Sequence, residues 1–311
     1  MIISASRRTD IPACYSEWLF SRLKEGYVLV RNPMNPRQVS RVSLSPDLVD
    51  GIVFWTKDPI PMIKRLRELE PYTYYFQFTL TPYGRDVEPN LPPKDQVLIP
   101  AFEKLSQILG RERVVWRYDP IFFSKRYTME YHCRAFQLMA ERLSGCTEKC
   151  TVSFLDFYRK TERNMRSLKV QKETGKLQLE LLERFAETAK AQGLYIDTCA
   201  ETGDFSRLGI GRASCIDCER LERIGNYRLR APKDPNQRPE CGCAVSIDIG
   251  AYDTCRSGCL YCYANENSAQ AEKNAGTHDP ASPLLFGKIG PDDVIKDRKM
   301  EVYRDYQLSF L

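Results

Sequence analysis

Short apolar strands alternate with amphipathic helices along the first 200 residues of this chain. The strand-like runs are rich in β-branched and aromatic residues and cover 2–5, 51–59, 72–81, 113–123, 149–158 and 194–201. Helical patterns of 10 to 18 residues separate them, and residues 27–44 form a two-stranded excursion around a Pro-Asn turn. About six or more parallel strands in this order predict an α/β fold, built as a partial or full (β/α) barrel.

Polar side chains follow most of these strands. They are Ser6 to Asp10, Thr56 to Asp58, Arg117 to Asp119, Asp156 and Cys199 to Glu201. Some of these residues will serve only to form turns or to cap helices. The carboxyl ends of parallel strands meet at one edge of the sheet, so we expect the set as a whole to line a ligand site there.

Composition narrows the class of protein. The chain has 311 residues, 42% of them hydrophobic, and a net charge of +5, which permits an anionic ligand without requiring one. Its apolar runs are too short for a membrane span and its first residues do not resemble a signal peptide, so we expect a cytoplasmic protein with no membrane partner. In a reducing compartment, twelve cysteines indicate metal or redox ligands rather than disulfides.

Three of these cysteines stand close together near the carboxyl terminus. Cys255, Cys259 and Cys262 have C-x3-C-x2-C spacing, and no fourth thiol follows them. A closed zinc site needs four protein ligands, so one alternative is that a distant cysteine completes it. The interpretation we favour is a [4Fe-4S] cluster with one iron left open to a small molecule, as in catalytic metal sites.

This motif, followed by Tyr263, resembles the cluster loop of radical S-adenosylmethionine (SAM) enzymes. The resemblance implies a (β/α) barrel and a [4Fe-4S] cluster whose open iron binds SAM. An electron from a donor such as flavodoxin or ferredoxin then cleaves SAM to a 5′-deoxyadenosyl radical that attacks an unknown substrate. More narrowly, the segments MIISASRRTDIPA, VRNPMNPRQVSRVSLSP, FWTKDP and DIGAYDTCRSGCLYCYAN are similar to an uncharacterised bacterial family called domain of unknown function 1848.

The position of the motif departs from the usual radical SAM order, in which it follows the first strand. A circular permutation explains this, with residues 244–250 as the first strand and residues 1–6 as the second. The resemblance then makes Ser4, Ser6 and Asp10 candidates for the SAM amino group and Tyr261 a candidate near the adenine. Arg117 is a candidate for the SAM carboxylate, because a guanidinium matches that group.

Five further cysteines lie just upstream of the motif. We favour an auxiliary [4Fe-4S] cluster on Cys199, Cys215, Cys241 and Cys243, with Cys218 as an alternative ligand and zinc as the alternative metal. The expected domains are a barrel core at 1–200, a Cys-rich metal-bound segment at 201–267 that packs on it, and a carboxyl-terminal tail at 268–311.

The sequence therefore predicts a radical SAM enzyme of unknown substrate. Cys14 and Tyr118 are further catalytic candidates because they follow or lie within barrel strands; Cys14 would donate a hydrogen atom to a substrate radical. Two alternatives stay open. One is a nucleic-acid repair or modification enzyme similar to spore photoproduct lyase, and the other is a non-catalytic zinc or iron–sulfur protein that binds nucleic acid.

Overall fold

The computed structural model describes residues 1–172 and 174–305. Its strands are β1 Ile2–Ala5, β2 Tyr27–Asn32, β3 Asn35–Ser43, β4 Gly51–Thr56, β5 Tyr74–Thr79, β6 Val114–Ile121, β7 Lys149–Phe154, β8 Tyr195–Thr198, β9 Gly211–Arg212, β10 Arg228–Leu229, β11 Ser246–Asp248, β12 Val294–Asp297 and β13 Arg304–Asp305. Its α-helices are α1 Ile11–Cys14, α2 Ser16–Glu25, α3 Ile60–Ile63, α4 Ile99–Leu109, α5 Met129–Leu143, α6 Arg159–Asn164, α7 Gly175–Ala191, α8 Cys218–Gly225 and α9 Ser268–Ala275.

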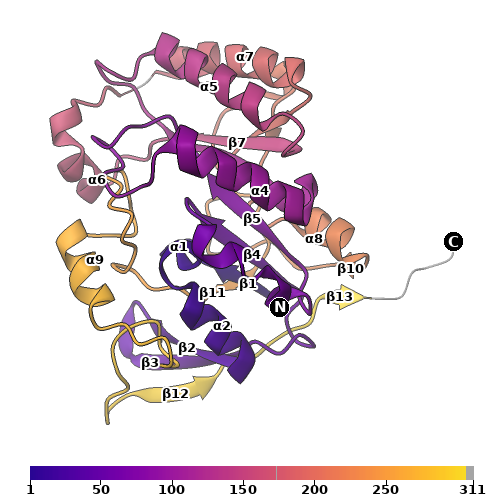
Figure 1. Ribbon diagram of the computed structural model, residues 1–311, viewed down its shortest axis with the longest axis vertical. Helices are drawn as coiled ribbons and strands as arrows, with labels where there is room; N and C mark the ends of the chain where they lie inside the picture. The colour runs from indigo at the N-terminus through magenta and orange to yellow at the C-terminus, as the bar shows by residue number, and fades with distance from the viewer. Residues whose placement is uncertain (173, 306–311) are drawn as a thin grey trace, which may run out of the picture.

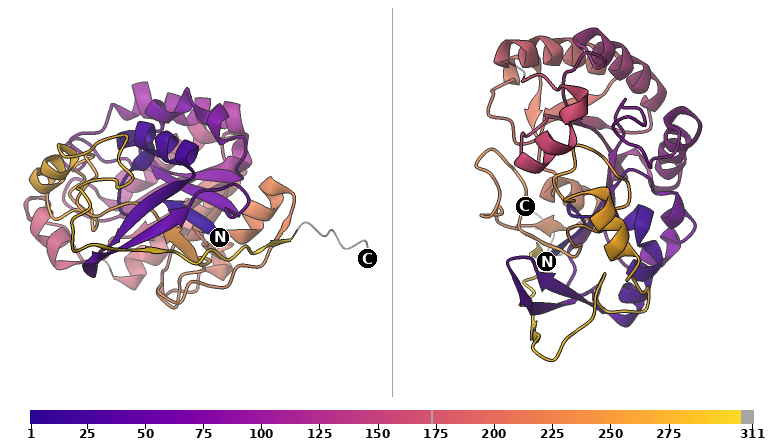
Figure 2. Two further views of the ribbon diagram at one scale, coloured as in Figure 1. Left: turned by 90° about the horizontal axis from the view of Figure 1, so that it is seen from below. Right: turned by 90° about the vertical axis from the view of Figure 1, so that its left-hand side faces the viewer.

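Eight strands form one parallel sheet in the order β11-β1-β4-β5-β6-β7-β8-β9 (Figure 1). The predicted α/β class with a parallel sheet is confirmed. In the described residues β11 and β9 are the two edges of this sheet, so it does not close into a full barrel. The carboxyl ends of the strands point to the side on which α6 and α9 lie (Figure 2, right).

The strand that leads into the cysteine motif lies at the edge of the sheet next to the first strand of the chain. Ile3 of β1 pairs with Ile247 of β11 on one side and with Ile52 of β4 on the other. The adjacency expected from a circular permutation is therefore present. As a result, a loop from late in the sequence meets the loops that follow the earliest strands.

Successive residues of each strand face opposite sides of the sheet. Ile3 and Phe54 pack in the large core formed with α2, α4, α5 and α7. Ile2, Val53 and Tyr75 face the other way and pack against the Cys-rich segment around α8. This segment thus covers the sheet face that the helices leave open (Figures 1 and 2).

Outside the main sheet, β2 and β3 form the predicted antiparallel pair, and β12 from the tail extends it. The carboxyl-terminal tail expected from residue 268 begins with helix α9. Asn267 caps this helix, because its side chain accepts a 2.8 Å hydrogen bond from the backbone N–H of Gln270. The last six residues of the tail lie outside the described residues.

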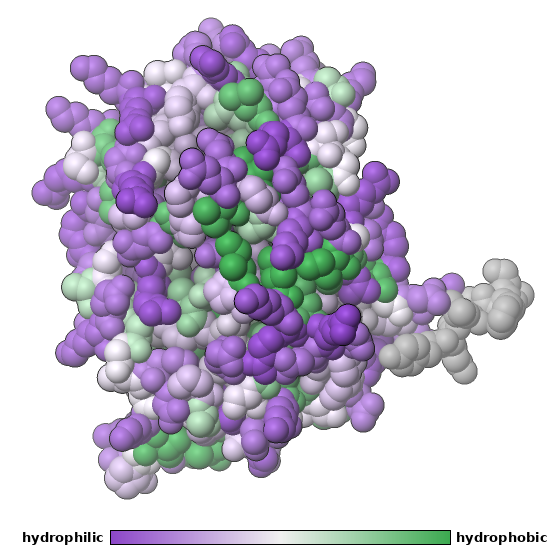
Figure 3. Space-filling view, viewed as in Figure 1, coloured by the Kyte–Doolittle hydropathy of each residue, from purple (hydrophilic) through white to green (hydrophobic). Residues whose placement is uncertain are grey.

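The face in Figure 3 is mainly hydrophilic, with apolar side chains gathered near its centre beside α4. Within the described part of the chain, no helix combines the length and the apolar character needed to cross a lipid bilayer.

Candidate active site

A cavity of about 470 Å³ lies at the carboxyl ends of the parallel strands. The polar clusters that follow β1, β4, β6, β7 and β8 all contribute to its wall, as does the cysteine loop after β11. The clusters that were expected to line a ligand site thus lie around one cavity. The lining residues include Ser6, Arg7, Arg8, Thr9, Asp10, Trp55, Lys57, Arg117, Asp119, Asp156, Arg238, Tyr261 and seven cysteines.

The loop that carries Cys255, Cys259 and Cys262 is fixed from both sides, and all three cysteines line the cavity. The Tyr15 hydroxyl, between α1 and α2, donates a 2.5 Å hydrogen bond to the carbonyl oxygen of Thr254. The segment between β5 and α4 holds the other end, where the Leu260 N–H donates to the Val87 carbonyl oxygen at 3.0 Å. Two elements that are distant in sequence thus position the three thiols.

A buried carboxylate anchors this loop to the cavity wall. Glu88 is 2% exposed, and its Oε1 accepts hydrogen bonds from Lys57 Nζ at 2.9 Å, from Thr81 Oγ1 at 2.9 Å and from the Tyr261 hydroxyl. Its Oε2 accepts from Lys94 Nζ. Burial alone would raise the pKa of Glu88, but the two ammonium groups outweigh it and lower that pKa to about 2. The carboxylate is therefore ionised and holds two cations beside the thiols.

A second carboxylate joins β11 to the loop after β1. Asp248 accepts hydrogen bonds from Ser4 Oγ at 2.9 Å, from Ser6 Oγ at 2.6 Å and from the backbone N–H of Arg7 at 2.8 Å. These contacts orient the residues that follow the first strand. They bring Arg7 to the cavity wall, where its guanidinium lies 5.3 Å from the centre of the Trp55 ring.

Cys14 lies next to the motif but outside the cavity lining. It ends α1, packs against the main core and forms a hydrogen bond with Cys255. This bond, followed by contacts from Ser257, lowers the pKa of Cys255 to about 5, although burial opposes the shift. Burial raises the pKa of Cys262 to about 11. Cys14 therefore supports Cys255 from the side away from the cavity.

The four thiols expected to form the second site also line the cavity, on the wall contributed by the Cys-rich segment. They are Cys199, Cys215, Cys241 and Cys243. Cys218, the alternative ligand, is the first residue of α8 and does not belong to the cavity lining.

A family model described as "Domain of unknown function (DUF1848)" matches residues 2–264. The chain belongs to this family. The match runs from β1 through β11 and the cysteine loop, so the cavity wall falls inside the DUF1848 region. The comparisons found no matching curated protein and no matching solved structure.

Of the residues that the SAM resemblance selected in this DUF1848 chain, four line the cavity and one does not. Ser6, Asp10, Arg117 and Tyr261 are in its wall, whereas Ser4 is fully buried beneath it. Asp10 already accepts hydrogen bonds from the backbone N–H groups of Lys57 at 2.7 Å and Ala13 at 3.0 Å. It therefore also ties α1 to the end of β4.

Arg117 has protein partners that differ from the expected one. Its guanidinium forms an ion pair with Asp119, in which Arg117 Nε lies 3.1 Å from Asp119 Oδ2. Arg117 Nη1 lies 2.9 Å from Cys215 Sγ. Burial would lower the pKa of Arg117, but Cys215 and Asp119 raise it well above its ordinary value. Asp119 and Cys215 already take up the N–H groups of this guanidinium. In this arrangement Arg117 therefore cannot also form the expected ion pair with a SAM carboxylate.

Tyr118 lies on the opposite side of β6 from the cavity. Its ring is fully buried against α5 and α7, and its hydroxyl contacts His132 Nδ1 at 2.9 Å. Neighbouring residues of a strand face opposite ways, so Arg117 and Tyr118 cannot share a site. We expected Tyr118 to be a catalytic residue, and the structure instead places it in the hydrophobic core.

Two polar atoms in the cavity wall lack partners, and sequence reasoning did not single them out. Within the described part of the chain, Arg7 Nη2 and Thr9 Oγ1 are buried and have no hydrogen-bond partner. A buried donor left without a partner is costly, which makes it a mark of a ligand-binding position. These atoms fit a ligand with acceptor oxygens, such as a carboxylate.

The three cysteine sulfurs of the loop are the type of ligand that an iron–sulfur cluster requires. No three His, Cys, Asp or Glu side chains of the described residues surround a common point that would suit a single metal ion. A cluster makes a different demand, because each iron takes its own thiolate and the sulfurs surround the cube from outside. Three thiols on one short loop, all facing one cavity, meet that demand.

Proposed function

We propose that this chain is a radical SAM enzyme that holds a [4Fe-4S] cluster on Cys255, Cys259 and Cys262. The observation that carries the proposal is that these three thiols line a cavity at the carboxyl ends of a parallel sheet, directly after a strand paired with β1. When bound, such a cluster supplies reductive cleavage of SAM at the one iron without a protein ligand.

The chain's own residues would bind and orient SAM. Arg7 and Thr9 have unpaired buried donors and take the place of Arg117 as candidate partners for the SAM carboxylate. Lys57 lies 5.3 Å from the centre of the Tyr261 ring and keeps positive charge beside the thiolates. The substrate and the electron donor, such as flavodoxin or ferredoxin, remain predictions.

The contacts of Cys14 suggest a closed site, because its thiol forms a hydrogen bond with that of Cys255. Its place behind the loop, against the core, supports three ligands rather than four. The alternative of a closed four-cysteine centre therefore makes a distinct prediction for a Cys14 variant.

The proposal is tested by anaerobic reconstitution of the wild-type chain and of Cys14→Ser with iron and sulfide. We expect both proteins to be brown, to contain at least about four irons per chain, and to form 5′-deoxyadenosine from SAM after reduction with dithionite. Chromatography of the products and iron analysis give the measurements.

Two results would contradict the proposal. A colourless wild-type protein that contains only zinc would reject the cluster. Loss of the cluster in Cys14→Ser, with its melting temperature unchanged, would show that Cys14 is a fourth ligand and that no iron is open to SAM.

Arg7→Met should weaken SAM binding about 10- to 100-fold, since a hydrogen bond from a charged donor contributes about 1.5–3 kcal/mol. Equilibrium dialysis of SAM against the reconstituted, unreduced protein measures this directly, without turnover. Arg212→Met is the matched control, because Arg212 is exposed and lies outside the cavity lining. Equal affinities for the two variants would remove Arg7 from the SAM site.

A further inference from the structure

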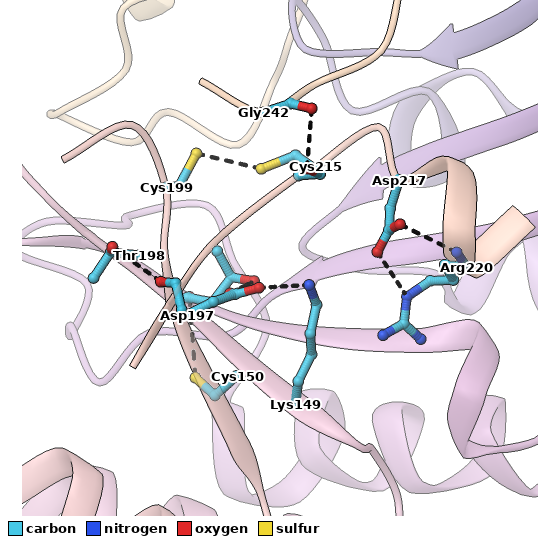
Figure 4. A network of polar contacts seen from close by, with 12 residues as sticks. Lys149, Cys150, Asp197, Thr198, Cys199, Cys215, Asp217, Arg220 and Gly242 are labelled. Atoms are coloured by element: carbon cyan, nitrogen blue, oxygen red, sulfur yellow. Dashed lines mark hydrogen bonds and ion pairs between the residues drawn. The ribbon is translucent and has the colours of Figure 1, made fainter. Parts of the chain in front are cut away.

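Four cysteine sulfurs from three separate segments meet on the sheet face that α8 covers. Cys199 follows β8, Cys215 precedes α8, and Cys241 and Cys243 precede β11. Cys199 Sγ and Cys215 Sγ are 3.3 Å apart and point toward one another (Figure 4). The Cys243 side chain lies next to those of both Cys215 and Cys241. The four side chains therefore form a continuous chain of contacts.

Two of these sulfurs have hydrogen-bond donors beside them. Arg117 Nη1 lies 2.9 Å from Cys215 Sγ, and the backbone N–H of Ile216 donates to Cys243 Sγ at 3.4 Å. Charge-assisted hydrogen bonds of this kind stabilise negative charge on sulfur away from water. Both Cys215 and Cys243 are 2% exposed, so water cannot replace these donors.

Cys218 does not share this environment. It begins α8, contacts the backbone of Ala231 and lies in the field of Asp217 and Glu222. The chain of contacts thus selects four of the five clustered cysteines and leaves Cys218 as a natural control.

The separation of the sulfurs discriminates between the metals that four thiolates can hold. Tetrahedral zinc with Zn–S distances of about 2.3 Å places its ligand sulfurs about 3.8 Å apart, close to van der Waals contact. In a [4Fe-4S] cluster each thiolate binds a different iron outside the cube, so the sulfurs are held apart. The 3.3 Å separation of the Cys199 and Cys215 sulfurs therefore favours one small ion.

We propose that Cys199, Cys215, Cys241 and Cys243 hold one zinc ion in a closed tetrathiolate site. In the described chain the four sulfurs do not yet surround a single point, so Cys199 and Cys241, at the ends of the chain of contacts, must rotate toward the ion. The zinc ties the segments after β8, before α8 and before β11 to one face of the sheet. The proposal does not depend on the proposed function, because none of these cysteines belongs to the SAM loop.

The test uses the full chain with Cys255, Cys259 and Cys262 replaced by alanine, which removes the proposed SAM cluster. Cells are grown with both iron and zinc, and metals in the purified protein are measured by mass spectrometry. We expect about one zinc per chain in this parent, as one tetrathiolate site requires. Adding Cys215→Ser or Cys241→Ser should lower zinc to background, whereas adding Cys218→Ala should leave it unchanged.

A second measurement needs no further substitution and covers the case in which a variant fails to fold. Thiols of the parent are alkylated before and after treatment with a zinc chelator, and the modified sites are mapped. Protection of the four named cysteines that the chelator abolishes supports the site. Iron and sulfide in place of zinc, zinc retained in Cys215→Ser, zinc lost in Cys218→Ala, or chelator-independent alkylation would each overturn it.

Discussion

Replacing Cys255, Cys259 and Cys262 together by alanine is expected to abolish SAM cleavage. Iron bound by the loop should fall to background and 5′-deoxyadenosine to the level of a protein-free blank, because thiolates are the ligands that hold such a cluster. Iron and sulfide assays after anaerobic reconstitution, together with product chromatography, measure both effects. The loss should be complete, since no other thiol faces the cavity from this loop.

The matched control replaces three cysteines that lie outside both thiol groups, Cys133, Cys146 and Cys218. None of them lines the cavity, so this triple variant should keep its iron and its rate of SAM cleavage. If the control loses as much iron as the loop variant, the loss reflects general thiol content. If the loop variant still cleaves SAM, the assignment of the cluster to this loop is wrong.

The parallel α/β class could be predicted from the sequence because it follows from local patterns. Strand and helix periodicities are set by which residues are buried, and they identify the parallel α/β class before any contact is known. The resemblance to radical SAM enzymes, with a circular permutation to explain the late motif, also predicted that β11 would lie beside β1, as it does. Closure of the sheet could not be predicted, because it depends on the tilt of the strands and on the segment that covers their inner face.

The errors at the site have two physical causes. Tyr118 was placed there together with Arg117 although adjacent strand residues face opposite ways, a signal that the sequence does contain. Glu88 lies in the irregular segment between β5 and α4, and its burial depends on contacts with Lys94 of the same segment and with Lys57 and Tyr261 from distant parts of the chain. No periodicity marks such a residue, so only the folded chain reveals it.

Glu88→Gln is expected to destabilise the fold by about 3–5 kcal/mol, because it leaves two buried ammonium groups without a countercharge. The amide has nearly the shape of the carboxylate, so the effect reports the lost charge rather than lost packing. Urea unfolding of the wild type and the variant at pH 7 measures the difference. The control is Glu17→Gln, which breaks an exposed ion pair with Arg65 and should cost less than about 1 kcal/mol.

The pH dependence of unfolding distinguishes this ion cluster from a general packing defect. The pKa of Glu88 falls from an ordinary 4.5 to about 2 on folding, so the unfolded chain binds the proton more readily than the folded one. The resulting stabilisation is complete above pH 4.5 and is lost as the pH falls toward 2, with a total of about 3 kcal/mol. In Glu88→Gln this part of the acid destabilisation should disappear. If wild type and variant lose stability in parallel between pH 5 and 2, Glu88 is not the ionised anchor of the cysteine loop.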